Sequence, residues 1–285
     1  MADALAISLR ALSFIAALQA AGAPLFLWLF ADRIGEARRP IAVLARRSAV
    51  AGLLLAVGHQ LVEPARVVGA LAGIGDGAMQ ALLLASDAGT ATIVRVFGLA
   101  LIAFASLSRR FGAAAAVAGG TLIVTSFTFM GHTAASDLRW LLIVLLILHL
   151  LIVALWFGSL LPLYLAGKYE DIRTNGALVR RFSALAIRLV PVIFLAGLGI
   201  AVVLVPGLAS LGTPYGTLLL SKIGGFALLM GLAALNKWRL GPAIEGGDSG
   251  ALRALQRSVL AEWVLIAAVL AATATMTALF APTAH

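Results

Sequence analysis

Apolar runs about as long as a membrane is thick recur along the whole chain. A bilayer core takes about 20 apolar residues as a helix, and eight stretches approach or exceed that length. These stretches are 5–31, 41–62, 88–108, 112–131, 138–166, 182–205, 215–236 and 254–281. Charged residues make up only 12% of the 285 residues, where a soluble domain has about 25%. The sequence therefore predicts an all-α integral membrane protein with about eight transmembrane helices in one domain, 1–285.

Two apolar segments need separate interpretation. The first, "MADALAISLRALSFIAALQAAGAPLFLWLF", resembles a signal peptide because "AAGA" looks like a small-residue cleavage site. Its start holds Asp3, however, and the apolar run continues past that site, so we expect a retained first helix. The second segment, 67–85, is interrupted by glycines and carries Asp76. We expect it to form an outer loop with a short helix at the membrane interface.

Positive charge is distributed unevenly between the connections. One set of connections contains 15 of the 21 lysines and arginines: 32–47, 109–110, 167–181 and 236–257. The other set contains almost none: 63–87, 132–137 and 206–214. Cytoplasmic loops carry the excess of Lys and Arg, so the first set is predicted to be cytoplasmic and both termini periplasmic. The net charge of +9 then orients the chain and does not indicate nucleic-acid binding.

The two halves of the chain share short motifs. "SDAGTATIVRVFG" parallels "TPYGTLLLSKIGG", which aligns Gly89 with Gly216, and "RRSAVAG" parallels "RRFSALA". Four spans in each half, 1–131 and 132–285, would form a parallel repeat about an axis along the membrane normal. We therefore expect two related four-helix halves.

Imidazoles and thioethers gather in the outer half of the predicted bundle. His59 lies near the outer end of the second span, and Met276 lies in the outer part of the eighth. His132 closes the fourth span soon after Met130. His149 lies about 11 residues into the fifth, roughly 16 Å deep at 1.5 Å per residue. The chain has no cysteine, and imidazole with thioether but without thiolate suits copper, especially Cu(I).

Each of these residues also has a purely structural interpretation. A lone histidine in a membrane helix can hydrogen-bond a neighbouring helix, and methionines fill gaps in packing. His132 and His149 are 17 residues apart and on different predicted helices. Any shared metal site therefore depends on how the helices pack.

Four charged residues also fall within predicted spans. Arg95 and Lys222 lie near the outer ends of their helices, where long side chains snorkel to the interface. Arg188 and Glu262 enter from the inner side, and an ion pair between them would lower the free energy of burying each charge. No nucleophile–base pair, phosphate loop or carboxylate dyad lies within a span, so we do not expect an enzyme.

The second half of the chain carries several linked motifs. They are "GHTA", "LHLLIVALWFGSLLPL", "RFSALAI", "LGTPYGTLLLSKIG", "NKWRLGPAI" and "SVLAEWVL". Within them, His149, Trp156 and Gly158 form an H-x6-W-x-G block, and Tyr215 and Lys222 belong to a Y-G-x5-K block. Together these motifs resemble the CopD copper-resistance family of bacterial inner-membrane proteins. The first half is similar to the longer members in hydropathy and length only.

The resemblance implies copper transport across the bacterial inner membrane, often beside a periplasmic copper-binding protein, CopC. The motif histidines are then His132, which would receive a copper ion at the outer mouth, and His149, which would hold it deeper. Trp156 would line the path on the same helix face as His149, and Gly158 would let a neighbouring helix approach closely. The outer loop holds only Met79, so we do not expect this chain alone to capture copper in quantity.

Two other functions use the same residues. Histidines from different spans can ligate a b-type haem and pass electrons across the membrane, which requires two of them at matching depth on facing helices. Alternatively, the chain binds copper without moving it, as a sensor or assembly partner. The partners expected from the sequence are copper, a CopC-like protein and the lipid bilayer, with no nucleic acid.

Overall fold

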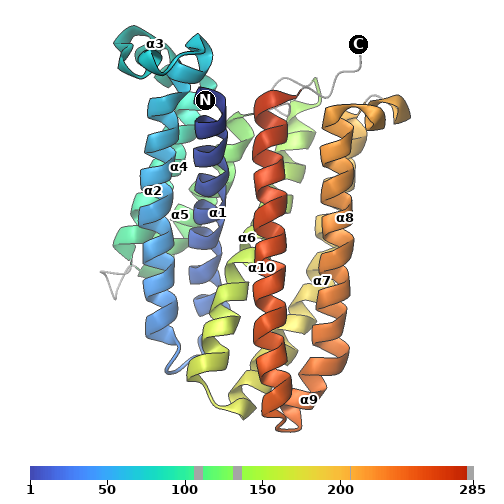
Figure 1. The fold of residues 1–285 in the computed structure, drawn as a ribbon. Helices are drawn as coiled ribbons and strands as arrows, with labels where there is room; N and C mark the ends of the chain where they lie inside the picture. The colour runs from blue at the N-terminus through green and yellow to red at the C-terminus, as the bar shows by residue number, and fades with distance from the viewer. Residues whose placement is uncertain (106–111, 131–136, 206, 281–285) are drawn as a thin grey trace.

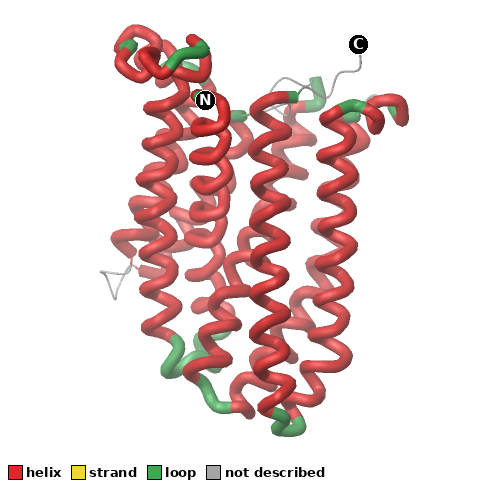
Figure 2. The backbone as a smooth tube through the Cα atoms, in the orientation of Figure 1, coloured by secondary structure: helices red, strands yellow, loops and turns green. Residues whose placement is uncertain are grey.

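The chain folds into a bundle of long helices that run side by side (Figures 1 and 2). The computed structural model describes residues 1–105, 112–130, 137–205 and 207–280. Within these residues, eight helices are long and apolar enough to cross a membrane. They are α1 (Ala2–Leu29), α2 (Arg38–Val68), α4 (Asp87–Ala105), α5 (Gly112–Ser126) with η2 (Phe127–Phe129), α6 (Arg139–Tyr169), α7 (Ile172–Leu204), α8 (Pro214–Leu235) with its continuation to Glu245, and α10 (Ser249–Leu279). The predicted all-α membrane fold is confirmed.

The start of α1 and the end of α10 lie at the same end of the bundle (Figure 1). We call it the outer end, after the charge-based prediction, and the opposite end the inner end. The segment 71–84 covers part of the outer end with two short helices, η1 (Leu71–Gly75) and α3 (Gly77–Leu84). The short helix expected between the second and third spans is therefore present. At the inner end, α9 (Gly241–Glu245) leads into α10.

Helix α1 is the most deeply buried span and packs against α2, α5, α6 and α10. Its closest approach is to α6, where Gly22 meets Gly158: a β-carbon on either glycine would collide with the backbone of the other helix. Small residues allow such close crossings between membrane helices. By contrast, α7 and α8 are the least buried spans. α7 packs mainly on α6 and α9, and α8 on α10 and the short η3 (Leu208–Gly212).

Helices α4 and α8 begin with the same local structure, as their shared motif suggested. Ser86 Oγ accepts a hydrogen bond from the Gly89 amide (3.4 Å), and Thr213 Oγ1 accepts one from the Gly216 amide (3.2 Å). Each hydroxyl also donates to the carbonyl three residues before it, at 2.6 and 2.7 Å. A β-carbon at either glycine would collide with the preceding turn. This geometry supports the proposal of two related halves.

Candidate functional site

His149 points from α6 toward α7. Its Nδ1 lies 3.2 Å from the carbonyl oxygen of Ile193. A carbonyl can only accept, so Nδ1 carries the proton and Nε2 keeps its lone pair. The ring packs closely on Gly197: a β-carbon there would lie 3.3 Å from His149 Cε1, which is a tight contact. The backbone of α7 thus fixes the tautomer of His149 and leaves the nitrogen that can bind a cation.

Lys222 of α8 lies within electrostatic range of the His149 ring and is half-buried. Both residues lie roughly 12–15 Å below the outer ends of their helices, at 1.5 Å per residue. Tyr215, from the same sequence block as Lys222, is buried in the first turn of α8. A copper ion on His149 Nε2 would therefore experience repulsion from the Lys222 ammonium.

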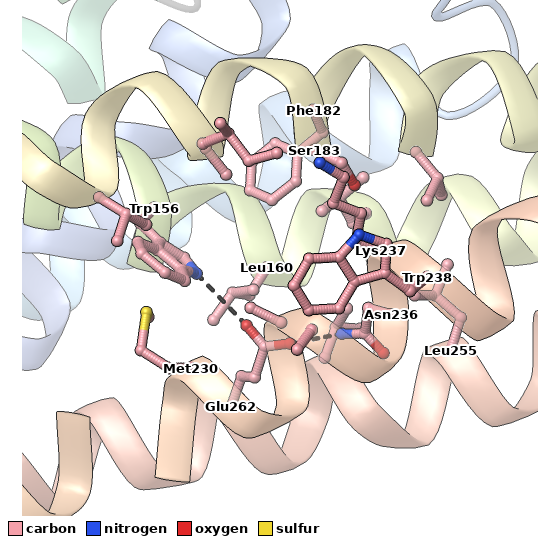
Figure 3. A pocket seen from close by; sticks show the side chains of 18 of the residues that line it. Trp156, Leu160, Phe182, Ser183, Met230, Asn236, Lys237, Trp238, Leu255 and Glu262 are labelled. Atoms are coloured by element: carbon pink, nitrogen blue, oxygen red, sulfur yellow. Dashed lines mark hydrogen bonds between the residues drawn. The ribbon is translucent and has the colours of Figure 1, made fainter. Parts of the chain in front are cut away.

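A cavity of about 290 Å³ opens on the inner side of His149, between α6, α7, α8 and α10 (Figure 3). The stacked rings of Phe194 and Phe226, with centroids 6.1 Å apart, link α7 to α8. Apolar side chains form most of the cavity lining, including Leu160 and Phe182. Lys237 and Trp238 belong to its inner part, with the Lys237 ammonium 5.7 Å from the Trp238 ring centroid.

One wall of this cavity is polar. The Glu262 carboxylate, 2% exposed, accepts hydrogen bonds from Trp156 Nε1 (3.3 Å) and Asn236 Nδ2 (2.5 Å) (Figure 3). The expected ion pair between Glu262 and Arg188 is wrong, because Arg188 is exposed on α7 while Glu262 faces the interior of the bundle. The sequence singled out Trp156 and Glu262 independently of each other. In the structure their side chains are hydrogen-bonded.

Gly158 lies on the far side of α6 from the cavity, against α1. Gln19 of α1 donates from Nε2 to the Gly158 carbonyl (3.0 Å) and accepts from Trp263 Nε1 (2.9 Å). Trp263 in turn stacks on Phe157, with ring centroids 5.4 Å apart. This buried link holds α1, α6 and α10 together beside the polar wall.

His59 lies in the other half of the bundle, in a charged cluster between α1 and α2. Its Nε2 is 3.5 Å from Glu63 Oε2, and Arg66 donates twice to Glu63 Oε1 at 2.6 and 2.8 Å. Arg10 and Arg95 also act electrostatically on His59. Asp3 also acts electrostatically on Arg66. Three arginines against two acids leave this cluster with a net positive charge, which opposes binding of a copper cation.

Arg95 does not snorkel, so the prediction for this residue is wrong. It is 4% exposed, and its Nε donates to Ser126 Oγ (3.0 Å). Its guanidinium lies 4.4 Å from the ring centroid of Phe127 and 5.2 Å from that of Phe14. Met130 Sδ accepts a long hydrogen bond (3.9 Å) from Arg95. Arg95 falls on the buried face of α4, where aromatic rings and a hydroxyl replace water as its surroundings.

The described structure does not bring the predicted metal ligands together. His149 contacts α7, His59 and Met130 lie in the cationic cluster region, and Met276 is buried near the outer end of α10. His132 lies outside the described residues. Within the described residues, no three His, Asp or Glu side chains are grouped as metal ligands would be.

Sequence reasoning missed Asn236, which completes the polar wall of the cavity. Asn236 was quoted only as part of "NKWRLGPAI", yet its side chain bonds Glu262. It begins a π-helical turn, η4 (Asn236–Leu240), in which the Gly241 amide bonds the Asn236 carbonyl. Such turns are rare and frequent at functional sites. Pro242 was the visible signal, because proline cannot continue the hydrogen-bond pattern of the helix.

Comparison with known proteins covers both halves of the chain. The family model "Copper resistance protein D" matches residues 176–276, and "Copper resistance protein D-like, N-terminal domain" matches residues 1–138. Lys222 and Glu262 lie within the first match, whereas His149 lies between the two.

A curated relative, the copper transport protein CutJ of Bacillus subtilis (strain 168), is 32% identical over 168 residues. These residues are 57% of this chain and 29% of the relative, so the chain spans less than a third of that protein's length. No solved structure matches the chain.

Proposed function

Because the chain belongs to the copper resistance protein D family, we propose that it moves copper across a bacterial inner membrane through its C-terminal half. Copper enters from the periplasmic side, where both termini lie, and passes His149 on its way to the cavity beside Glu262. The chain performs no chemistry on a substrate. Copper is its cargo, and a periplasmic CopC-like protein is the partner that delivers or receives it.

The hydrogen bond from His149 to Ile193 is the observation that carries this proposal. A structural histidine needs an acceptor for its N–H, but a ligand needs that acceptor placed so that the other nitrogen stays available. His149 has this arrangement on a rigid helix, and Lys222 acts electrostatically on its ring. Gly197 is a positioning residue, because the ring packs closely on it.

The two halves differ in electrostatics, which favours the C-terminal half as the route. The His59 cluster combines Arg10, Arg66 and Arg95 with two acids, Glu63 and Asp3. Around His149, Lys222 is the cation that acts on the ring, and the carboxylate of Glu262 attracts cations further inward. A cation therefore meets a lower barrier between α6, α7, α8 and α10.

A b-type haem is not favoured by this geometry. His59 and His149 lie in different halves of the bundle: His59 contacts Glu63 on α2, and His149 contacts α7. The two described histidines cannot act as axial ligands of one haem without a rearrangement of helices.

Copper flux into liposomes tests the proposal. The purified full-length protein is reconstituted into vesicles that enclose a Cu(I)-sensitive dye, and copper is supplied outside under reducing conditions. We expect copper entry well above that of protein-free vesicles, and little entry of zinc in the matched assay, because thioethers favour Cu(I). A copper rate equal to that of protein-free vesicles, from protein that remains folded, would overturn the proposal. A Soret band in the purified protein would point to haem instead.

A further inference from the structure

The buried carboxylate of Glu262 has two hydrogen-bond donors and no ion-pair partner among the described residues. Trp156 and Asn236 each donate to one of its oxygens. The described salt bridges do not include it, and Arg188 is exposed elsewhere on α7. Hydrogen bonds from neutral donors stabilise the charged form of a carboxylate. A carboxyl group is thus held deep in the bundle without a salt bridge among the described residues, and the Lys237 ammonium lines the inner part of the same cavity.

Two further groups beside this carboxylate can hold a cation. Asn236 Oδ1 is buried and has no hydrogen-bond partner among the residues that the structure describes, although buried acceptors are nearly always satisfied. Met230 lines the same cavity, and its sulfur points toward the Trp156 ring (Figure 3). A carboxylate, an amide oxygen and a thioether therefore border one cavity of about 290 Å³, large enough for an ion with some of its water.

The single negative charge of the Glu262 carboxylate favours a monovalent over a divalent cation. A single carboxylate carries one negative charge, so a monovalent cation forms a neutral pair with it. A divalent cation would leave one positive charge uncompensated in hydrocarbon, which costs several kcal/mol. Hard divalent ions also take six or more oxygen ligands, and the three side chains do not supply them. The thioether adds a preference for a soft ion.

We infer that Glu262, Asn236 and Met230 form an intramembrane site for monovalent copper, separate from His149. The identity of the ion rests on the proposed copper transport, whereas the existence of a cation site rests on the unpaired carboxylate and the unsatisfied amide oxygen. Trp156 positions the carboxylate and closes the outer side of the site. It lies seven residues after His149 on α6, so the two sites are roughly 10 Å apart along the helix.

Anaerobic Cu(I) titration against a chromophoric chelator tests the inference on the purified full-length protein. We expect Glu262→Gln to lose one equivalent of bound copper, and Met230→Leu to weaken the same site roughly tenfold. Glu245→Gln is the matched control, because Glu245 is paired with Arg180 at the surface and its loss should leave copper binding unchanged. X-ray absorption of the wild type should show sulfur and oxygen ligands that Met230→Leu and Glu262→Gln remove.

The glutamine variant is expected to fold. Glutamine has the shape of glutamate and still accepts from Trp156, and the Asn236 amide can turn to accept from the new amide group. A Glu262→Gln protein that is monodisperse and binds as many copper equivalents as the wild type would overturn the inference while leaving the proposed transport intact. A wild type that binds no copper would overturn both.

Discussion

His149 and Lys222 act on the same small region of the bundle with opposite effects. The imidazole offers a lone pair to a cation, and the ammonium of Lys222 repels it. Repulsion between two like charges is stronger at the low effective dielectric constant of a protein interior than in water. Lys222 thus limits how tightly copper is held at His149, which favours release toward the cavity.

Removal of this charge should strengthen copper binding at His149. We expect Lys222→Met to raise the Cu(I) affinity of the outer site roughly tenfold or more, and to slow release. Chelator competition in a Glu262→Gln background isolates this site. Lys168→Met is the control, because Lys168 lies over the Tyr164 ring near the inner end of α6. Equal affinities in Lys222→Met and its parent would show that the ammonium does not act on bound copper.

At this scale the sequence identified residue types better than contacts. His149, Trp156 and Glu262 were recognisable because polar groups in long apolar helices are expensive and need a reason. The hydrogen-bond partners of these residues were not recognisable from the sequence. Ile193 contributes a backbone carbonyl, which no side-chain pattern reveals. Arg95 was misassigned because depth along a helix can be counted from a sequence, whereas the face that turns inward depends on neighbouring helices.

The polar wall formed by Glu262, Trp156 and Asn236 depends on how α1 and α6 cross. Gly22 and Gly158 bring the two backbones together, and Gln19 fastens them to Trp263 of α10. This contact fixes the position of α6 relative to α10. It therefore also fixes where His149 and Trp156 lie relative to α10. The sequence indicated a close approach at Gly158, but the partner helix could not be read from it.

A single methyl group at this crossing should disrupt the fold. In Gly22→Ala the new β-carbon meets the Ala154 carbonyl and Gly158, which are backbone atoms that cannot move aside cheaply. We expect a loss of stability of about 1–3 kcal/mol or more, seen as a lower unfolding temperature in detergent. Gly224→Ala is the matched control: a β-carbon there meets nothing within 4 Å, and alanine favours the helix by up to about 1 kcal/mol. Equal unfolding temperatures for the two variants would contradict the assigned crossing.

On the scale of the whole molecule, one helix start is alike in the two halves, but the charged residues deeper in those helices have different surroundings. The starts of α4 and α8 match in hydrogen bonds and glycine packing. At the equivalent positions deeper in these helices, Arg95 is enclosed by aromatic rings, whereas Lys222 lies near a histidine. Helix number and approximate bounds were readable from apolar length, and the matching starts of α4 and α8 from a short shared motif; the repeat of whole halves stays a prediction. The cavity was not readable, because it depends on how α6, α7, α8 and α10 pack together.

The orientation of the bundle follows from the arginine-rich connections. Reporter fusions placed after residues 171 and 247 should be cytoplasmic, and fusions after 75 and 210 periplasmic, because Lys and Arg concentrate in the former connections. A reversed pattern would place His149 toward the cytoplasm and reverse the proposed sequence of sites.

The most direct test of the account compares one histidine from each half. Copper flux is measured in parallel liposomes that contain the wild type, His149→Leu or His59→Leu, each at matched protein content and with its unfolding temperature recorded. We predict that His149→Leu lowers flux by at least about tenfold, as loss of a metal ligand commonly does, while His59→Leu retains most of it. A folded His149→Leu protein that carries copper at the wild-type rate, or a collapse of flux in His59→Leu alone, would contradict a route through the C-terminal half.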